Sequence, residues 1–425
     1  MWWRLIAGAF IALTSVNAVA EETVKVGLIL PMTGPFTTTG KQVEAGARFY
    51  MQQNGASVDG KKIELILRDD AGIADNSRRI AQELLVGDKV NILAGFGLTP
   101  IALAVAPLAT ETKTPMVVMA AATAIVTERS PYIVRSSFPQ AAPVVIIADW
   151  EAKHGLKKVA TLVSDFAPGH DSETYFKQTF TRAGGEVPLA LRVPLLNPDF
   201  APFLQRVRDA APDGIFVFIP AGQAATMMRQ FVERGLDKSG IRLFGAGDIT
   251  DDDLLNNMGD VALGIETAYF YSAAHPSEKN KAFVEGVKRA NGGMRANFFG
   301  VSGYDGMHLI YEAIRKTGGK TDGDSFIGAV KGMSWESPRG PMTIDPETRD
   351  VIGNIYMRRV ERVNGELWNI GSRPWRTSRT RSRRRGNSLP RRQGRSDSPA
   401  ACSHEAPSIA SMRIALSPGR DANGR

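Results

Sequence analysis

The sequence predicts an α/β fold made of two doubly wound, Rossmann-like lobes, and three observations carry that prediction. Short apolar runs alternate along the chain with segments whose apolar residues recur at helical spacing. The apolar runs are too continuous for strands with one solvent-facing side, which indicates parallel sheets covered by helices on both faces. The alternation occurs twice, in residues 21–138 and again in 139–272, so we expect two units of the same kind.

In the first unit we expect strands at residues 24–30, 63–67, 90–94 and 116–119. Helices lie between these strands. The first helix carries an apolar stripe from Val43 to Met51 at positions i, i+3, i+4, i+7 and i+8. The second begins near Asp75, and the third begins near Thr99.

In the second unit the expected strands are residues 159–163, 189–193, 215–219 and 241–244. A helix at 141–153 precedes them, a loop at 164–170 leads into a helix at 171–183, and later helices include residues 203–207 and 224–232. Two long helices at 278–290 and 300–317, a short one at 325–330 and a hairpin turning at Asn364-Gly365 follow. These late elements imply a chain that crosses between the lobes more than once.

One turn in the first unit has the features of an anion site. The strand breaks at Gly95 and Gly97, and a helix restarts with Thr99 at its N-cap and Pro100 at its first position. Unpaired N–H groups beside a hydroxyl at a helix N-terminus form a receptor for a carboxylate or phosphate. A plain strand-to-helix turn explains the same residues.

The N-terminus predicts export. A charged start, an apolar run from Leu5 to Val16 and small residues at Ala18 and Ala20 are typical of a secretory signal peptide, residues 1–20. The run is too short for a membrane-spanning helix. The single cysteine, Cys402, excludes an internal disulfide framework, so the core must stabilise the exported protein. We therefore expect a bacterial protein of the periplasm.

Residues 371–425 form an Arg-rich tail that we expect to be disordered. It holds 13 Arg, no Lys and three acidic residues, a net charge of +10, whereas the rest of the chain holds 39 basic and 41 acidic groups. This near-neutral body argues against a nucleic-acid partner. The tail is either a basic arm for nucleic acid or anionic lipid, or the product of a translational frame change. Permissible codons for residues 373–385, read in a neighbouring frame, encode A-T-V-E-N-V-K-D-P-I-K-E-A.

Motifs for catalysis are missing from the sequence. The chain has no Walker loop, no complete dinucleotide fingerprint, no G-x-S-x-G elbow and no H-E-x-x-H helix. Its five histidines lack metal-ligand spacing. We interpret the acids Asp251–Asp253 as helix-start residues rather than a cation site. We expect no cofactor, no metal and no enzymatic activity, with a nicotinamide-dependent enzyme as a less favoured alternative.

The ordered set of motifs resembles the type I periplasmic solute-binding proteins of ABC transporters, the leucine/isoleucine/valine-binding group. The resemblance covers about residues 21–369 and rests on Val26–Pro35 with Gly40, Gly46-Ala47, Asp69-Asp70, Gly95–Pro100, Ala120–Thr123, Asp165 with Gly169, and Gly303–Asp305. It implies lobes joined by three crossovers that close on a small ligand. Lobe 1 would hold residues 21–138 plus about 273–340, and lobe 2 residues 139–272 plus about 341–370.

The resemblance also implies a monomer that delivers a small carboxylate ligand to the membrane subunits of an ABC permease. The ligand would bind between facing strand-to-helix loops. On lobe 1, Thr99, Ala121 and Thr123 match the family positions that hold the ligand carboxylate. Thr39 stands where the family often has an aromatic residue.

On lobe 2, Phe166 and Pro168 match a loop whose bulky residue covers the ligand, and Asp248 matches an acid that pairs with an amino-acid ammonium. An inward-pointing Asp248 would favour an amino acid, since an uncompensated ammonium is costly to bury. Phe36 and Tyr271 would complete a flat apolar slot unless they lie in the lobe cores. A hydrophobic amino acid, such as a branched-chain one, and an aromatic or aliphatic acid are both expected ligands. A sensor domain for a signalling partner is the alternative function.

Overall fold

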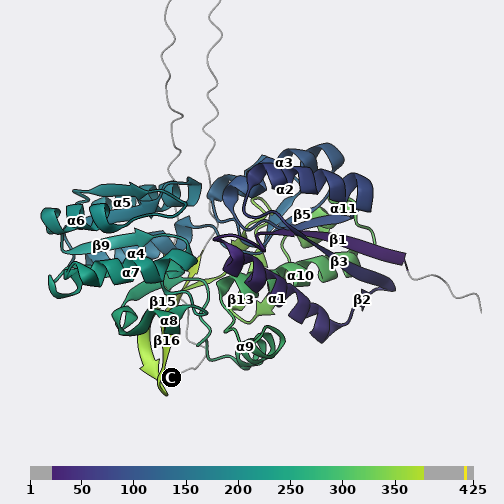
Figure 1. Cartoon of the computed structure of the whole chain (residues 1–425). Coiled ribbons are helices and arrows are strands. Elements are labelled where there is room, and N and C mark those ends of the chain that lie inside the picture. Colours follow the sequence, from purple (N-terminus) through teal and green to yellow (C-terminus); the bar gives the residue numbers. More distant parts are fainter. Residues whose placement is uncertain (1–21, 378–415, 419–425) are drawn as a thin grey trace, which may run out of the picture.

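Two α/β lobes lie side by side in a computed structural model of the chain, which describes residues 22–377 and 416–418 (Figure 1). The expected signal peptide and most of the expected tail lie outside the described residues. No helix within the described residues is long and apolar enough to cross a membrane.

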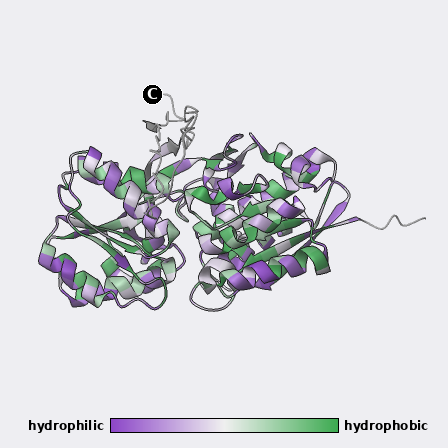
Figure 2. Cartoon of the chain, turned by 90° about the horizontal axis from the view of Figure 1, so that it is seen from above, coloured by the Kyte–Doolittle hydropathy of each residue, from purple (hydrophilic) through white to green (hydrophobic). Residues whose placement is uncertain are grey.

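Lobe 1 is built on a six-stranded sheet with the strand order β2-β3-β1-β4-β5-β6. The strands from β3 to β6 pair in parallel, and only the short β2 is antiparallel. Helices cover both faces, so the central strands β4, β5 and β6 are fully buried, whereas β3 near the edge is only partly buried (Figure 2). The strands are β1 (Glu22–Leu30), β2 (Ser57–Val58), β3 (Lys61–Asp69), β4 (Ile92–Gly95), β5 (Met116–Val118) and β6 (Ile133–Arg135). The helices are α1 (Thr37–Asn54), α2 (Ala74–Glu83), α3 (Thr99–Thr112), α9 (Glu278–Ala290), α10 (Phe298–Thr317) and α11 (Gly323–Val330).

Lobe 2 is built on a sheet with the strand order β17-β16-β15-β11-β10-β9-β7-β8. Its strands β7 to β11 pair in parallel, and β15 to β17 extend the sheet in antiparallel fashion. The strands are β7 (Val159–Ser164), β8 (Ala190–Val193), β9 (Gly214–Phe218), β10 (Arg242–Ala246), β11 (Glu266–Tyr269), β15 (Asn354–Val363), β16 (Glu366–Thr377) and β17 (Leu416–Pro418). The helices are α4 (Ala141–Lys153), α5 (Ala167–Arg182), α6 (Ala201–Ala210), α7 (Ala224–Glu233) and α8 (Leu255–Met258). The prediction of two α/β lobes with parallel sheets is confirmed.

The chain passes between the two sheets three times, after β6, after β11 and after β14 (Val351–Ile352). Before the third passage, β12 (Ser334–Ser337), β13 (Gly340–Ile344) and β14 form a small antiparallel sheet. Arg135 of lobe 1 forms an ion pair with Asp350 at 2.7 Å, and the Arg349 Nε donates to the Ile133 carbonyl at 2.9 Å. These contacts hold the small sheet on lobe 1, and the chain enters the lobe 2 sheet with β15 only after residue 352.

The second half of the hairpin is longer than expected. β16 runs to Thr377, seven residues into the segment that we expected to be disordered from 371 onward. Pairing with β15 continues through these residues across a register shift between Tyr356 and Arg358, and it reaches the pair of Asn354 with Arg376. The Trp375 ring also meets the Trp150 ring edge-on at 5.8 Å. Strand pairing and this contact order the first residues of the tail.

Candidate ligand-binding site

A pocket lies between the lobes, where the carboxyl ends of the parallel strands of both sheets approach each other, the usual place for a ligand in open α/β sheets. Lobe 1 lines it with residues that follow β1, β4, β5 and β6, and lobe 2 with residues at the ends of β7, β9, β10 and β11. The lining residues are Phe36, Thr39, Gly97, Leu98, Thr99, Ala120, Ala121, Ala122 and Gln140 on one side, Phe166, Pro168, Phe218, Pro220, Ala221, Asp248 and Tyr269 on the other, and Phe299 at the start of α10.

The turn after β4 brings Thr99 to the pocket. Gly95 has a φ of +103°, and a Cβ there would lie 2.4 Å from the Ile29 carbonyl oxygen, so only glycine fits. Phe96 follows in the left-handed region with a φ of +67°, a conformation that a non-glycine residue adopts only when its surroundings enforce it. Thr99 is not the N-cap that we expected, because α3 is capped by Leu98 without a side-chain bond. The Thr99 hydroxyl is therefore not occupied with capping.

The Thr99 hydroxyl instead lies 3.0 Å from the hydroxyl of Thr123. Thr123 itself is buried beside the pocket and is not among its lining residues. Buried Arg135 holds the loop that carries Ala121 and Thr123, donating to their carbonyl oxygens at 3.3 and 2.8 Å. The ion pair with Asp350 offsets the charge of Arg135. The lobe 1 wall is thus a pair of loops held by buried polar contacts, with hydroxyl groups at the pocket.

The lobe 2 wall is mainly aromatic. Phe166 precedes α5, and its ring stacks on that of Phe218 at 6.1 Å between ring centroids. Pro168 stands in the first turn of α5, which begins at Ala167 rather than at residue 171 as expected. Opposite, Phe36 fits against Gly72, where a Cβ would lie only 2.9 Å from the Phe36 ring. The pocket therefore has flat apolar surfaces contributed by both lobes.

Asp248 is the single acidic residue that lines the pocket within the described residues. Burial raises the pKa of its carboxyl group to about 7, and a hydrogen bond with Tyr269 and the charge of Arg358 offset only part of this effect. Its Oδ2 atom is buried and has no hydrogen-bond partner in the described part of the chain. Asp248 thus points inward, and a buried acceptor without a partner is costly unless a ligand supplies one.

Gln140 lines the pocket but was not among the site residues predicted from the sequence. Its backbone N–H donates to the Ala122 carbonyl at 2.8 Å, which places it beside the Thr99 end of the pocket. Its side chain is buried, and its Nε2 atom has no hydrogen-bond partner among the residues that the structure describes. No motif marks Gln140, because its only distinguishing feature is its position directly before α4, at the first passage between lobes.

Tyr271 does not line the pocket. β11 ends at Tyr269, and Tyr271 lies in the passage that follows, fully buried with its ring edge-on to Phe283 of α9. Tyr269, two residues earlier, lines the pocket instead. Phe218 and Phe299 were missed as well, since each belongs to a segment that also has the composition of a buried core. The other predicted residues, Phe36, Thr39, Thr99, Ala121, Phe166, Pro168 and Asp248, all line the pocket.

The three consecutive acids Asp251–Asp253 are not helix-start residues, because α8 begins only at Leu255 and the first two acids turn inward. Asp251 accepts a hydrogen bond from Asn297 of lobe 1 at 2.8 Å, and Asp252 accepts one from Asn369 at 2.9 Å. The Asp251 bond joins the two lobes, whereas the Asp252 bond lies within lobe 2, because Asn369 belongs to β16. No group of three metal-ligating side chains occurs within the described ranges.

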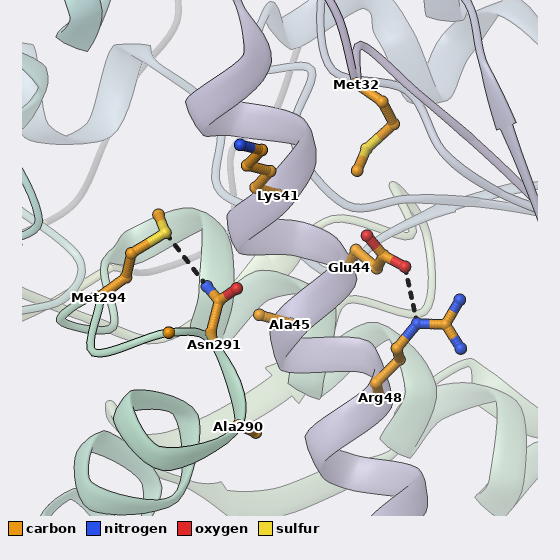
Figure 3. A pocket seen from close by; sticks show the side chains of 9 residues that line it. Met32, Lys41, Glu44, Ala45, Arg48, Ala290, Asn291 and Met294 are labelled. Carbon is orange, nitrogen blue, oxygen red and sulfur yellow. Dashed lines mark hydrogen bonds and ion pairs between the residues drawn. The ribbon is translucent and has the colours of Figure 1, made fainter.

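A second hollow, of about 510 Å³, lies on lobe 1 between α1 and the connection from α9 to α10 (Figure 3). Two of its charged residues are paired with each other, since Glu44 accepts from Arg48 at 2.7 Å, and the Asn291 amide contacts the Met294 sulfur at 3.6 Å. None of its lining residues contributes a buried polar atom without a partner. The smaller pocket between the lobes is therefore the better candidate for selective binding.

The model of the periplasmic binding protein family matches residues 23–366. The chain belongs to this family. Leu/Ile/Val-binding protein homolog 6 of Brucella melitensis is 44% identical over 352 residues, 82% of this chain and 90% of the relative. A solute binding protein of an ABC transporter from Rhodopseudomonas palustris BisB5, solved with 3,4-dihydroxybenzoic acid, is 62% identical with a TM-score of 0.81, covering 83% of this chain and 97% of that one. Its counterpart from R. palustris HaA2, solved with p-hydroxybenzoic acid, is 43% identical with a TM-score of 0.80 over the same shares.

The lobes of this periplasmic binding protein also touch at the edge of the pocket. The backbone N–H of Ala124, on lobe 1, donates to the Asp171 carboxylate of α5 at 3.3 Å. Burial raises the pKa of Asp171, and the Ala124 bond and the charge of Arg135 oppose that rise. In the described structure the lobes therefore contact each other at two places, through Ala124 with Asp171 and through Asp251 with Asn297.

Proposed function

We propose that this periplasmic binding protein captures an aromatic carboxylic acid and delivers it to the membrane subunits of an ABC transporter. The observation that carries the proposal is the combination of aromatic rings from both lobes with hydroxyl and amide groups that come from the lobe 1 side of the pocket. Such a lining suits a flat apolar body with one carboxylate. The two R. palustris proteins with bound aromatic acids support this ligand class.

In this proposal the ligand carboxylate lies at the lobe 1 wall. Thr99 donates from its hydroxyl, and Gln140 Nε2 gains the acceptor that it lacks. No lysine, arginine or histidine lines the described pocket, so neutral donors and the N-terminus of α3 hold the charge. The ring of the ligand lies among Phe36, Phe166 and Phe218.

A hydrophobic amino acid is the second candidate ligand. The inward position of Asp248 favours it, because a carboxylate can pair with an ammonium group. The similarity to a Leu/Ile/Val-binding protein homolog supports the same reading. Both candidates carry a carboxylate, so they share the lobe 1 contacts and differ in what they present to lobe 2.

The protein would act as a monomer in the periplasm, after removal of residues 1–20, and would bind its ligand without turning it over. The lobe boundaries of this proposal are those of the three passages, after β6, β11 and β14. Comparison of the mature N-terminus and of periplasmic and cytoplasmic fractions of the producing cells tests the export step directly.

Thermal shift assays with benzoates, leucine, phenylalanine, sugars and inorganic phosphate test the ligand class. We expect the largest rise in melting temperature with a benzoate, since a ligand that binds only the folded state stabilises it by mass action. Mass spectrometry of the ligand released from denatured protein gives an independent answer. Stabilisation by sugars or phosphate alone would refute the proposal.

A further inference from the structure

Two buried polar atoms at the pocket lack a hydrogen-bond partner within the described residues. They are the Gln140 Nε2 atom on lobe 1 and the Asp248 Oδ2 atom on lobe 2. The residues are only 2% and 7% exposed, so water does not readily satisfy either group. Buried polar groups in native proteins are nearly always paired, and both of these residues line the space where a ligand would sit.

The two atoms differ in chemical character. Gln140 Nε2 is a donor and lies with the hydroxyl of Thr99 on lobe 1. Asp248 Oδ2 is an acceptor and lies on lobe 2, where Tyr269 is its neighbour in the pocket lining. A ligand that satisfies both walls must therefore present an acceptor to lobe 1 and a donor to lobe 2.

We propose that Asp248 selects aromatic acids that carry a hydroxyl group on the side of the ring remote from the carboxylate. This inference rests on the proposed function, because it takes an aromatic acid as the ligand. The carboxylate satisfies the donors of lobe 1, and the ring hydroxyl donates to Asp248 Oδ2. An unsubstituted benzoate would leave Oδ2 unpaired in a buried site, which lowers its affinity.

The surroundings of Asp248 favour a neutral donor over an ammonium group. Arg358 lies directly behind the Asp248 loop, where its guanidinium donates to the Gly247 carbonyl at 3.1 Å and approaches the Tyr269 ring at 5.4 Å. Arg358 is fully buried and attracts the charge of Asp248. An ammonium group would add a second cation close to this guanidinium, whereas a hydroxyl adds none. An α-amino acid also carries its donor and its acceptor on one carbon, not at opposite ends.

A pair of ligands of nearly equal size tests the inference. Isothermal titration calorimetry compares 4-hydroxybenzoate with 4-fluorobenzoate, which keeps the carboxylate and the ring but has no donor. We expect the wild-type protein to bind 4-hydroxybenzoate at least about tenfold more tightly, the effect of one hydrogen bond to a charged group. Leucine and phenylalanine serve as the ammonium-bearing ligands.

Substitutions at Asp248 assign the preference to that residue. In Asp248→Ala we expect the ratio of the two affinities to fall to within about threefold, because neither ligand then meets a carboxylate acceptor at this position. Asp248→Asn keeps an acceptor oxygen and should retain part of the preference. Asp237→Ala, at an exposed residue of the same lobe outside the pocket, is the matched control. Thermal unfolding of each variant, and its affinity for 4-fluorobenzoate, show whether the pocket is intact.

The outcomes separate this inference from the proposed function. If the wild-type protein binds both benzoates equally, or if Asp248→Ala keeps the preference, the inference is overturned while the proposed function stands. If no benzoate binds, the proposed function itself fails. Tight binding of leucine that is lost in Asp248→Ala would overturn the inference in favour of an ammonium contact.

Discussion

Lobe 1 and lobe 2 each supply one wall of the pocket. The two walls differ in how much loop backbone and how many large side chains they contribute. On lobe 1 the wall includes loops whose backbone is fixed by Gly95 and by Arg135, and these loops present small side chains and the Thr99 hydroxyl beside the Phe36 ring. On lobe 2 it consists of large side chains, chiefly Phe166 and Phe218, with the carboxyl group of Asp248. The difference teaches that the proposed carboxylate site depends mainly on loop geometry, whereas the proposed choice among ligands depends mainly on side chains.

The largest effect should come from removing the support of the lobe 1 wall. Arg135→Met breaks the buried ion pair with Asp350 and removes one donor from each of the Ala121 and Thr123 carbonyls. We expect the free energy of unfolding to fall by about 3–5 kcal/mol, the range for breaking a buried ion pair. Urea unfolding measures it. As a control, Arg79→Met breaks an exposed pair with Glu83 and should lower the free energy of unfolding by less than about 1 kcal/mol. Equal losses in the two variants would show that the buried contacts of Arg135 do not stabilise the protein more than an exposed ion pair does.

A smaller effect is expected from the hydroxyl group at the surface of the same wall. Thr99→Val keeps the shape of the side chain and removes its donor, so the affinity for every carboxylate ligand should fall by ~1–3 kcal/mol. Titration calorimetry with benzoate and 4-hydroxybenzoate should give the same loss for both. Thr110→Val, on the exposed side of the same helix, is the control. Unchanged affinity in Thr99→Val would remove Thr99 from the site.

Changes on the lobe 2 wall should be smaller and selective. Phe166→Leu removes a ring that stacks with Phe218 and lines the pocket. We expect the affinity for aromatic acids to fall by about 0.5–1.5 kcal/mol. The affinity for an aliphatic acid of similar length should hardly change. Competition binding with benzoate and hexanoate measures the two affinities, and a uniform loss for both would contradict the division of roles between the walls.

The smallest effect concerns pH. Because burial raises the pKa of Asp248 to about 7, its carboxyl group is mostly protonated at pH 6 and mostly ionised at pH 8. An ionised carboxylate is the stronger acceptor, so the preference for 4-hydroxybenzoate over 4-fluorobenzoate should grow severalfold from pH 6 to pH 8. Tyr269 and Arg358 are the groups that act on this carboxyl, and neither changes charge in that range. In Asp248→Asn the preference should be independent of pH.

The lobe 1 wall was largely predictable from the sequence, and the lobe 2 wall was only partly so. Glycines, a hydroxyl and a proline in close succession are a local pattern that brought Thr99 into the prediction, and the family resemblance added Ala121. Phe218 and Tyr269 end apolar strands, where sequence cannot separate a core residue from one at the mouth of a cleft. Their role depends on how the second lobe meets the first, which no local pattern encodes.

The same limit explains the errors at Tyr271 and Thr99. Tyr271 has the same character as Tyr269, but the strand ends between them, and strand ends are poorly marked in sequence. The N-cap was misplaced by one residue because Thr99 has the chemistry of a cap while its hydroxyl meets Thr123 instead. In both cases a short-range rule was overridden by a long-range contact.

Gln140 has a consequence for the mechanics of the protein. It lies at the end of the first passage between the lobes, directly before α4, and it also lines the pocket. A ligand that accepts a hydrogen bond from its amide restrains the connecting segment itself. Ligand binding would then restrain the first passage between the lobes directly. No rearrangement of the lobe cores would be needed to transmit the effect.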